Sequence, residues 1–289
     1  MRIKTKAQKE ISAGPHLSNK RFKRLFSRKI TVIGFVLVVF IIAVAIFAPI
    51  IAPNDPLKVN MSLRFEGPSS SYWLGTDNLG RCIASRIIWG ARMSLLYSLC
   101  VLGLMLVISI PAGLISGYAG GRVDAVIMRI IDIFLSLPTF LMALAIAGML
   151  GPSTQNMIIA MASVWWAPYA RLIRGMAQQI KQQDFILAAK SAACTHMQII
   201  FKHILRNIAS TIIVMSTLEV GSIILAIASF SFIGLGAQPP NPEWGIMLSD
   251  SKEFMQTQPQ LMIYPGIAII ITVMAFNLLG EELKNAMLE

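Results

Sequence analysis

The sequence predicts an all-α membrane protein with about six transmembrane helices, and its composition and its uncharged segments carry that prediction. Hydrophobic residues make up 55% of the chain and charged residues only 13%. A soluble domain carries roughly 25% charged residues, so much of the usual charge is missing. A helix needs about 18 uncharged residues to cross a bilayer core. The chain contains several uncharged runs longer than this, which excludes an ordinary soluble domain.

The uncharged runs divide into six predicted crossings. The first run lies between Lys29 and Asp55, and its spanning length distinguishes it from the short apolar stretch of a cleavable signal peptide. The run 133–170 is too long for one crossing, and a polar, turn-like cluster at 151–156 divides it into two. The predicted crossings are 30–52, 93–121, two helices within 133–170, about 207–236, and 254–280.

The distribution of basic residues predicts the orientation. Of the 25 Lys and Arg residues, 19 fall on the side that carries both termini, so the positive-inside rule places both ends in the cytoplasm. The net charge of +11 does not indicate nucleic-acid binding, because the basic residues flank helices that lie in a lipid bilayer. The predicted parts are a cytoplasmic basic tail (1–29), the first helix (30–52), an extracytoplasmic loop (53–92), a five-helix core (93–280) and a cytoplasmic tail (281–289).

Residue patterns for enzyme chemistry are missing from the sequence. Cys82, Cys100 and Cys194 fall outside, within a helix and inside, so they are expected to be unpaired thiols. The three histidines form no His-Glu-x-x-His pair, and no glycine is followed by lysine, which excludes that zinc site and a phosphate-binding loop. We therefore expect no catalytic residue, metal or cofactor in this chain, and ATP is expected to bind to another chain if it drives this one.

The inner segment 175–206, within the five-helix core, is the most informative part of the sequence. Four small residues are followed by four large apolar ones, which predicts two short helices with a tight joint. Such a segment is typical of an anchor that enters the groove of another protein, but an amphipathic loop lying at the membrane explains the spacing equally well. The two sets are Ala188, Ala189, Ala192 and Ala193, and Ile199, Ile200, Phe201 and Ile204.

This inner segment resembles the Glu-Ala-Ala loop of bacterial ABC-importer permeases. Ala188, Ala189 and Leu205 match the pattern of that loop. Leu187 stands where the family has Glu, Ala193 where it has Gly, and Arg206 where it has Pro.

Nearly the whole chain is similar to the C-type permease of the peptide and nickel importers. Cys82 replaces an Asp that is usual in that branch. The matching motifs, in order along the chain, are Leu74-Gly75-Thr76-Asp77 with Gly80-Arg81, Gly90-Ala91-Arg92 with Ser94-Leu95, Gly120-Gly121 with Asp124, Met128-Arg129 and Asp132, Ala167 with Tyr169-Ala170-Arg171 and Arg174, Ser229-Phe230-Ser231-Phe232-Ile233-Gly234-Leu235-Gly236 with Gln238-Pro239-Pro240, and Pro265-Gly266 with Phe276-Asn277-Leu278-Leu279-Gly280.

The resemblance implies a type I ABC-importer permease in the bacterial plasma membrane. It implies a homologous second permease, two ATPase subunits that bind ATP and Mg²⁺, and an extracytoplasmic solute-binding protein, while this chain itself catalyses nothing. Small peptides, nickel and metal bound to an opine-type chelator all remain open as substrates. A cytoplasmic coupling helix at about 187–200 would contact an ATPase, with Leu187, Ala188, Ala189, Ala193, Thr195, His196, Met197 and Ile200 as the contact residues.

Charged residues inside the predicted crossings need separate interpretations. Glu219 lies near the middle of the fifth crossing, where a lone carboxylate costs several kcal/mol. It is predicted either to line the transport pathway or to lie at the interface with the second permease, and a paired structural role is the alternative. An ion-coupled secondary transporter is the alternative function, but it requires paired intramembrane ionisable groups, and only Glu219 qualifies.

Two further groups are predicted to be structural. Asp124, Arg129 and Asp132 are spaced for ion pairs along one helix. Three tryptophans are expected to mark helix ends at the membrane interface rather than to form a substrate cage. These are Trp165, Trp166 and Trp244.

Overall fold

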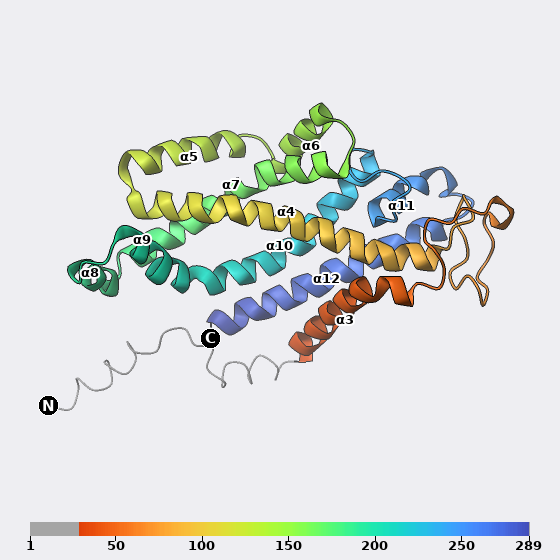
Figure 1. Ribbon diagram of the computed structural model, residues 1–289, viewed down its shortest axis with the longest axis horizontal. Coiled ribbons are helices and arrows are strands. Elements are labelled where there is room, and N and C mark those ends of the chain that lie inside the picture. The colour runs from red at the N-terminus through yellow and green to blue at the C-terminus, as the bar shows by residue number, and fades with distance from the viewer. Residues whose placement is uncertain (1–28, 289) are drawn as a thin grey trace.

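The computed structural model describes residues 29–288, and within them the regular structure is helical, without a strand. Most of the predicted basic tail, residues 1–28, lies outside the described part. Seven long helices form an elongated bundle (Figure 1). They are α3 (Lys29–Ile51), α4 (Ile83–Ala119), α5 (Gly121–Leu135), α6 (Thr139–Leu150), α7 (Thr154–Lys181), α10 (Arg206–Ile233) and α12 (Gln260–Leu288).

Short elements gather at the two opposite ends of this bundle. One end carries α8 (Asp184–Ser191) and α9 (His196–Gln198), and the other carries the loop between α3 and α4 together with α11 (Figure 1). The chain therefore separates the inner loop from the outer loop by the full length of the bundle. The other short elements are η1 (Met61–Leu63), η2 (Ile199–Leu205), α11 (Trp244–Asp250) and η3 (Lys252–Phe254).

Four helical segments of the described chain are long and apolar enough to cross a membrane: α3, α4, the continuous helix from α9 through α10, and α12. A fifth crossing is formed if α5 and α6, which meet at an angle of 80°, are counted as one bent span. The remaining predicted crossing, the second helix within 133–170, corresponds to α7, whose 28 residues are long enough at about 1.5 Å per residue but more polar than the others.

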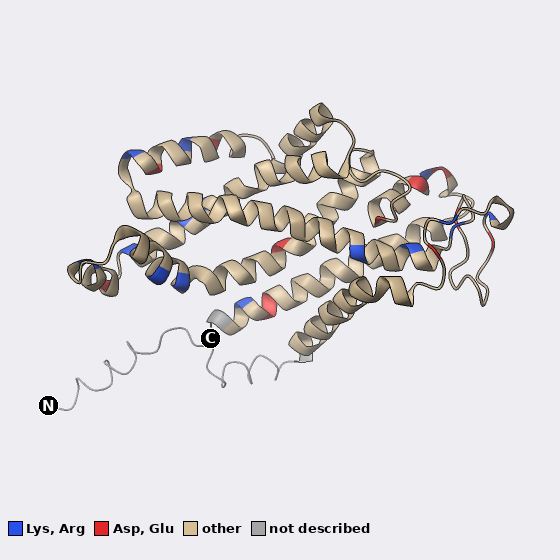
Figure 2. Cartoon of the chain, in the orientation of Figure 1, with Lys and Arg blue, Asp and Glu red and all other residues tan. Residues whose placement is uncertain are grey.

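Charges lie mainly toward the two ends of the bundle, while its middle is nearly free of them (Figure 2). Large apolar side chains on α3 point away from the protein, as contact with lipid requires. Ile46, Phe47 and Ile50 are 62%, 51% and 81% exposed. The all-α membrane fold that the composition predicts is therefore confirmed.

Two predicted boundaries differ from the structure, and the structure contains one break that was not predicted. The outer loop was expected to extend to residue 92, but α4 already begins at Ile83, because Arg86 is buried and paired with acidic groups instead of lying in a solvated loop. The tail at 281–289 was expected to follow the last helix, yet α12 continues to Leu288. The chain also breaks before Thr139, where Pro138 disfavours a helical conformation in Leu137.

The predicted division of the run 133–170 is confirmed. α6 ends at Leu150, Gly151 adopts a positive φ of 88°, and α7 starts after Ser153. The Ser153 hydroxyl accepts hydrogen bonds from the backbone N–H groups of Gln155 and Asn156. It thereby caps two of the free N–H groups at the start of α7.

Helices α4 and α7 form the most extensive helix pair of the bundle. Glycines on α4 allow the backbones to approach closely. A Cβ added to Gly113 would lie 2.7 Å from the carbonyl oxygen of Ala170, and one added to Gly117 would lie 2.7 Å from the Cβ of Ala177. This seam runs toward the end of the bundle that carries the inner loop, so it positions that loop.

Candidate functional site

The inner loop is packed against its own bundle. Ile186 and Ala189 of α8 are buried together with Ile199, Ile200 and Ile204. These side chains contact the ends of α4 and α7 through Leu114, Tyr118, Ile173 and Ala177. The loop is therefore fixed to the bundle and is not a free segment lying on a membrane surface.

The joint between α8 and α9 is tight, as the small residues predicted. Ala193 has a φ of 58°, in the left-handed region that favours glycine. Glycine is the residue that the Glu-Ala-Ala pattern has at this position, so the backbone keeps the shape of the pattern although the side chain differs. Thr195 then caps α9 through a reciprocal pair of hydrogen bonds with Gln198.

The predicted coupling residues divide into a buried set and an exposed set. Ala189 and Ile200 are buried and anchor the loop. Leu187, Met197 and neighbouring Phe201 are 56%, 62% and 54% exposed, so three large apolar side chains of the loop are open to solvent. We call these three residues the coupling surface. Ala188, Ala193, Thr195 and His196 are exposed beside it.

His196 also ties the loop to α4. Its Nδ1 lies 2.7 Å from the hydroxyl of Tyr118, and the two rings meet edge to face with centroids 5.6 Å apart. Lys181 of α7 also contacts Tyr118, with its Nζ 5.7 Å from the Tyr118 ring centroid. The position of the coupling surface is thus set by three elements, α4, α7 and α9.

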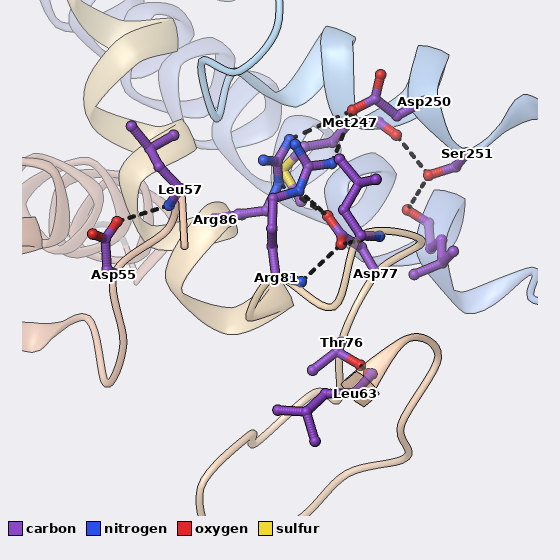
Figure 3. Close-up of polar contacts among 12 residues, drawn as sticks. Asp55, Leu57, Leu63, Thr76, Asp77, Arg81, Arg86, Met247, Asp250 and Ser251 are labelled. Atoms are coloured by element: carbon purple, nitrogen blue, oxygen red, sulfur yellow. Dashed lines mark hydrogen bonds and ion pairs between the residues drawn. The ribbon is translucent and has the colours of Figure 1, made fainter. Parts of the chain in front are cut away.

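The opposite, outer end contains a buried ion-pair cluster (Figure 3). Arg81 Nε lies 2.6 Å from Asp77 Oδ2, and Arg81 Nη2 lies 3.3 Å from Asp250 Oδ2. Arg86 lies 3.6 Å from the same two carboxylates. Two positive and two negative groups therefore balance in the interior, and they join the outer loop to α11.

The Gly-Thr-Asp-x-x-Gly-Arg motif is explained by the shape of this outer loop. Gly75 and Gly80 have positive φ values of 77° and 70°, and a Cβ on either would collide with a backbone oxygen, that of Glu66 or Asn60. The Asp77 carboxylate accepts hydrogen bonds from the backbone N–H groups of Leu79 and Arg81. The motif therefore folds the loop, and the sequence offered no signal that Asp250 completes the cluster.

Glu243 caps the short helix α11 from a fully buried position. Its carboxylate accepts hydrogen bonds from Gly245 N at 2.8 Å and Ile246 N at 3.1 Å, and Ser94 Oγ on α4 donates to it at 3.3 Å. Burial raises the pKa of this carboxyl above its usual value. Trp244, expected at the membrane interface, is instead buried, and its indole N–H donates to Ile87 O at 3.0 Å.

Glu219 is not a lone carboxylate. The hydroxyl of Tyr169 on α7 donates a hydrogen bond to Glu219 Oε2 at 2.9 Å. Trp165, one turn before Tyr169, also lies beside the carboxylate. Trp165 was expected at a helix end, but it stands in the middle of α7. Trp166 beside it packs on Phe134.

The acidic residues of α5 pair with arginines of α7 and not with Arg129 of their own helix. Arg174 holds Asp124 in a two-pronged contact, with distances of 2.5 and 2.6 Å, and Arg171 pairs with Asp132. The expected structural role is therefore found, but the expected pairing along α5 is wrong, because the carboxylates face the neighbouring helix. Within residues 29–288, no group of three or more metal-binding side chains is present.

Comparisons with known proteins decide the family. Residues 109–286 match the family described as binding-protein-dependent transport system inner membrane component. Residues 19–68 match the N-terminal transmembrane domain of oligopeptide transport permease C. The chain belongs to the inner-membrane permeases of binding-protein-dependent transport systems.

Relatives support this assignment along nearly the whole chain. The dipeptide transport system permease protein DppC of Alkalihalophilus pseudofirmus is 42% identical and covers 92% of this chain and 88% of its own. The nickel transport system permease protein NikC of Escherichia coli K12 is 35% identical, with 90% and 94% covered. The glutathione transport system permease protein GsiD of Pectobacterium atrosepticum is 39% identical, with 92% and 89% covered.

The fold matches a solved importer. A chain from an inward-facing structure of the MetNI methionine ABC transporter aligns with a TM-score of 0.53 at 16% identity, covering 69% of this permease and 95% of that chain. The protein is therefore a multi-pass inner-membrane permease subunit of an ABC importer, with the type I permease fold that the motifs implied. Such subunits are not enzymes. Neither the relatives nor the fold favour the ion-coupled transporter.

Proposed function

We propose that this permease pairs with a homologous second permease to form the pathway for a small peptide or a transition metal, free or chelated. The proposal is supported by the names of its relatives, which carry dipeptide, nickel and glutathione. Two ATPase subunits bind and hydrolyse ATP below the membrane, and an extracytoplasmic solute-binding protein delivers the substrate above it. The permease itself holds no cofactor.

The observation that carries the coupling role is the two-sided inner loop. Its buried side, including Ile186, Ile199 and Ile204, is fixed to α4 and α7, while the coupling surface leaves Leu187, Met197 and Phe201 exposed. Exposed apolar side chains on a rigid support are typical of a protein–protein contact. An ATPase groove that receives this surface removes it from water.

The same loop is joined to the membrane part without an interruption. α9, η2 and α10 follow one another directly from His196 to Ile233. A displacement of the coupling surface is therefore transmitted along a continuous helix that crosses the membrane. In the proposed cycle, ATP binding draws the ATPases together, the coupling surfaces move with them, and the two permeases rock to open the pathway to the outer side.

A double variant tests the coupling surface. Leu187→Asp with Met197→Asp places two charges into the apolar contact without touching the buried side of the loop. Burying an unpaired charge is costly, and a loss of about 3 kcal/mol weakens docking roughly a hundredfold. We expect the variant to insert normally and to lose ATPase subunits on purification in nanodiscs, together with the ATP turnover that the binding protein stimulates.

Lys58→Ala is the matched control, since Lys58 is exposed in the outer loop. It is expected to keep the parental ATPase content and turnover. Parental turnover in the double variant as well would remove the inner loop from the coupling role.

A further inference from the structure

The exposed face of α10 differs from that of α3. The outward side chains of α3 are apolar, as contact with lipid requires. α10 exposes Ser210 and Ser222, while the partly exposed Thr217 and Ser229 donate their hydroxyl protons to carbonyl oxygens of the same helix, those of Ile213 and Leu225. A spanning helix that carries a partly exposed carboxylate, as α10 does at Glu219, is suited to a water-filled pathway or to another protein.

The acidic group of α10 lies halfway along this helix. Glu219 is the fourteenth of its 28 residues and is partly exposed. The carboxylate has an aromatic side chain on α7 as its hydrogen-bond donor, Tyr169 at 2.9 Å, and a second, Trp165, beside it. Trp165 and Tyr169 are both partly exposed and stand four residues apart, so they share one face of α7.

A single carboxylate with two aromatic rings suits one kind of cation better than another. A primary ammonium group is neutralised by one carboxylate, and the faces of neighbouring Trp and Tyr rings add to its binding where they are open. Here both aromatic side chains approach the carboxylate through their hydrogen-bond donors. A transition-metal dication instead requires several N, S or O ligands, and residues 29–288 offer no group of three His, Cys, Asp or Glu side chains that would supply them.

We propose that Glu219, Tyr169 and Trp165 form a site for a primary ammonium group of the substrate, such as the free amino terminus of a small peptide, on its way along α10. This inference rests on the proposed function and narrows its substrate class from peptides and metals to solutes that carry an ammonium group. Within the site, the Tyr169 hydroxyl holds the carboxylate in place through its hydrogen bond.

The competing explanation of these contacts is that they only join α7 to α10 and bind no substrate. Glu219→Gln separates this explanation from the ammonium site. Glu219→Gln keeps an oxygen that accepts the Tyr169 hydrogen bond, so the tie between the helices is retained, but the negative charge is lost. Tyr169→Phe keeps the ring and removes the hydroxyl, so it preserves the charge and loosens its orientation.

The test measures uptake by proteoliposomes that contain the complete importer and its binding protein. Three probes are compared: alanyl-alanine, N-acetyl-alanyl-alanine, which lacks the ammonium group, and Ni²⁺. The parent is expected to import the free dipeptide faster than the acetylated one. Glu219→Gln is expected to reduce import of the free dipeptide about tenfold, the effect of a desolvated cation contact, and to leave the acetylated form unchanged. Tyr169→Phe is expected to give a smaller reduction.

Several results would overturn the ammonium site. These are parental dipeptide uptake by Glu219→Gln, an equal fall for both peptides, or ATP-driven uptake of Ni²⁺ without uptake of the dipeptide. Each leaves the proposed importer function standing, because the uptake is still driven by ATP. Failure of the parent to import any probe in an ATP-dependent manner would instead contradict both proposals.

Discussion

At the scale of single residues, the positions that depart from simple sequence patterns carry the most information. Glu219 was predicted to line the pathway or to lie at the interface with the second permease, with a paired structural role as the alternative, and Tyr169 supplies a hydrogen-bond partner from the neighbouring helix. The sequence places these residues 50 positions apart, so spacing alone gave no sign of the contact. Ala193 shows the opposite case, because it stands where the family pattern has glycine and its φ of 58° lies in the left-handed region that favours glycine.

Ala193 gives a prediction at this scale. Its φ of 58° strains an L-residue, and glycine adopts this conformation without a steric penalty. Ala193→Gly is therefore expected to stabilise the assembled protein by about 1 kcal/mol, partly offset by the greater freedom of glycine in the unfolded chain. Thermal unfolding in detergent should show a higher Tm. A Tm below that of the parent would show that the joint does not adopt this backbone conformation in the folded protein.

At the scale of elements, the uncharged runs predicted the existence of the long helices and the division of the run 133–170. They did not predict helix boundaries where charge is buried. α4 starts earlier than the charge pattern predicts, because Arg86 is neutralised by Asp77 and Asp250, a contact made across the fold. The bend between α5 and α6 was missed although Pro138 marks it, since hydropathy alone does not register a backbone restriction.

The seam between α4 and α7 gives a prediction for an element pair. Gly113→Leu forces a side chain against Ala170 and Ile173, where an added Cβ already lies 2.7 Å from both. Overpacking of this kind typically costs about 1–3 kcal/mol. We expect a lower Tm and reduced ATP turnover, because the seam supports the inner loop.

Gly103→Leu on the same helix is the matched control. An added Cβ at Gly103 meets no atom within 4 Å, so this variant is expected to keep the parental Tm. An equal loss of stability in both variants would show that leucine on α4 destabilises the protein irrespective of the seam.

At the scale of the whole molecule, the structure separates two tasks at the two ends of one bundle. The outer loop is held in shape by buried ion pairs and by glycines in its motif, and the inner loop presents an apolar surface on a fixed base. The helix from His196 to Ile233 connects the inner loop with the middle of α10, where Glu219 lies. The overall fold and family were thus predictable from motif order, while the contacts that build each site depend on residues brought together only by folding.

The composition of the complex tests the central claim, a permease that works only with ATPase partners, most directly. The measurement is the mass of the intact complex purified through a tag on this chain from its native membrane, by native mass spectrometry. We expect a four-subunit assembly of this chain, one homologous permease and two ATPases. A mass that corresponds to this chain alone, or to copies of it without an ATPase, would contradict the proposed importer.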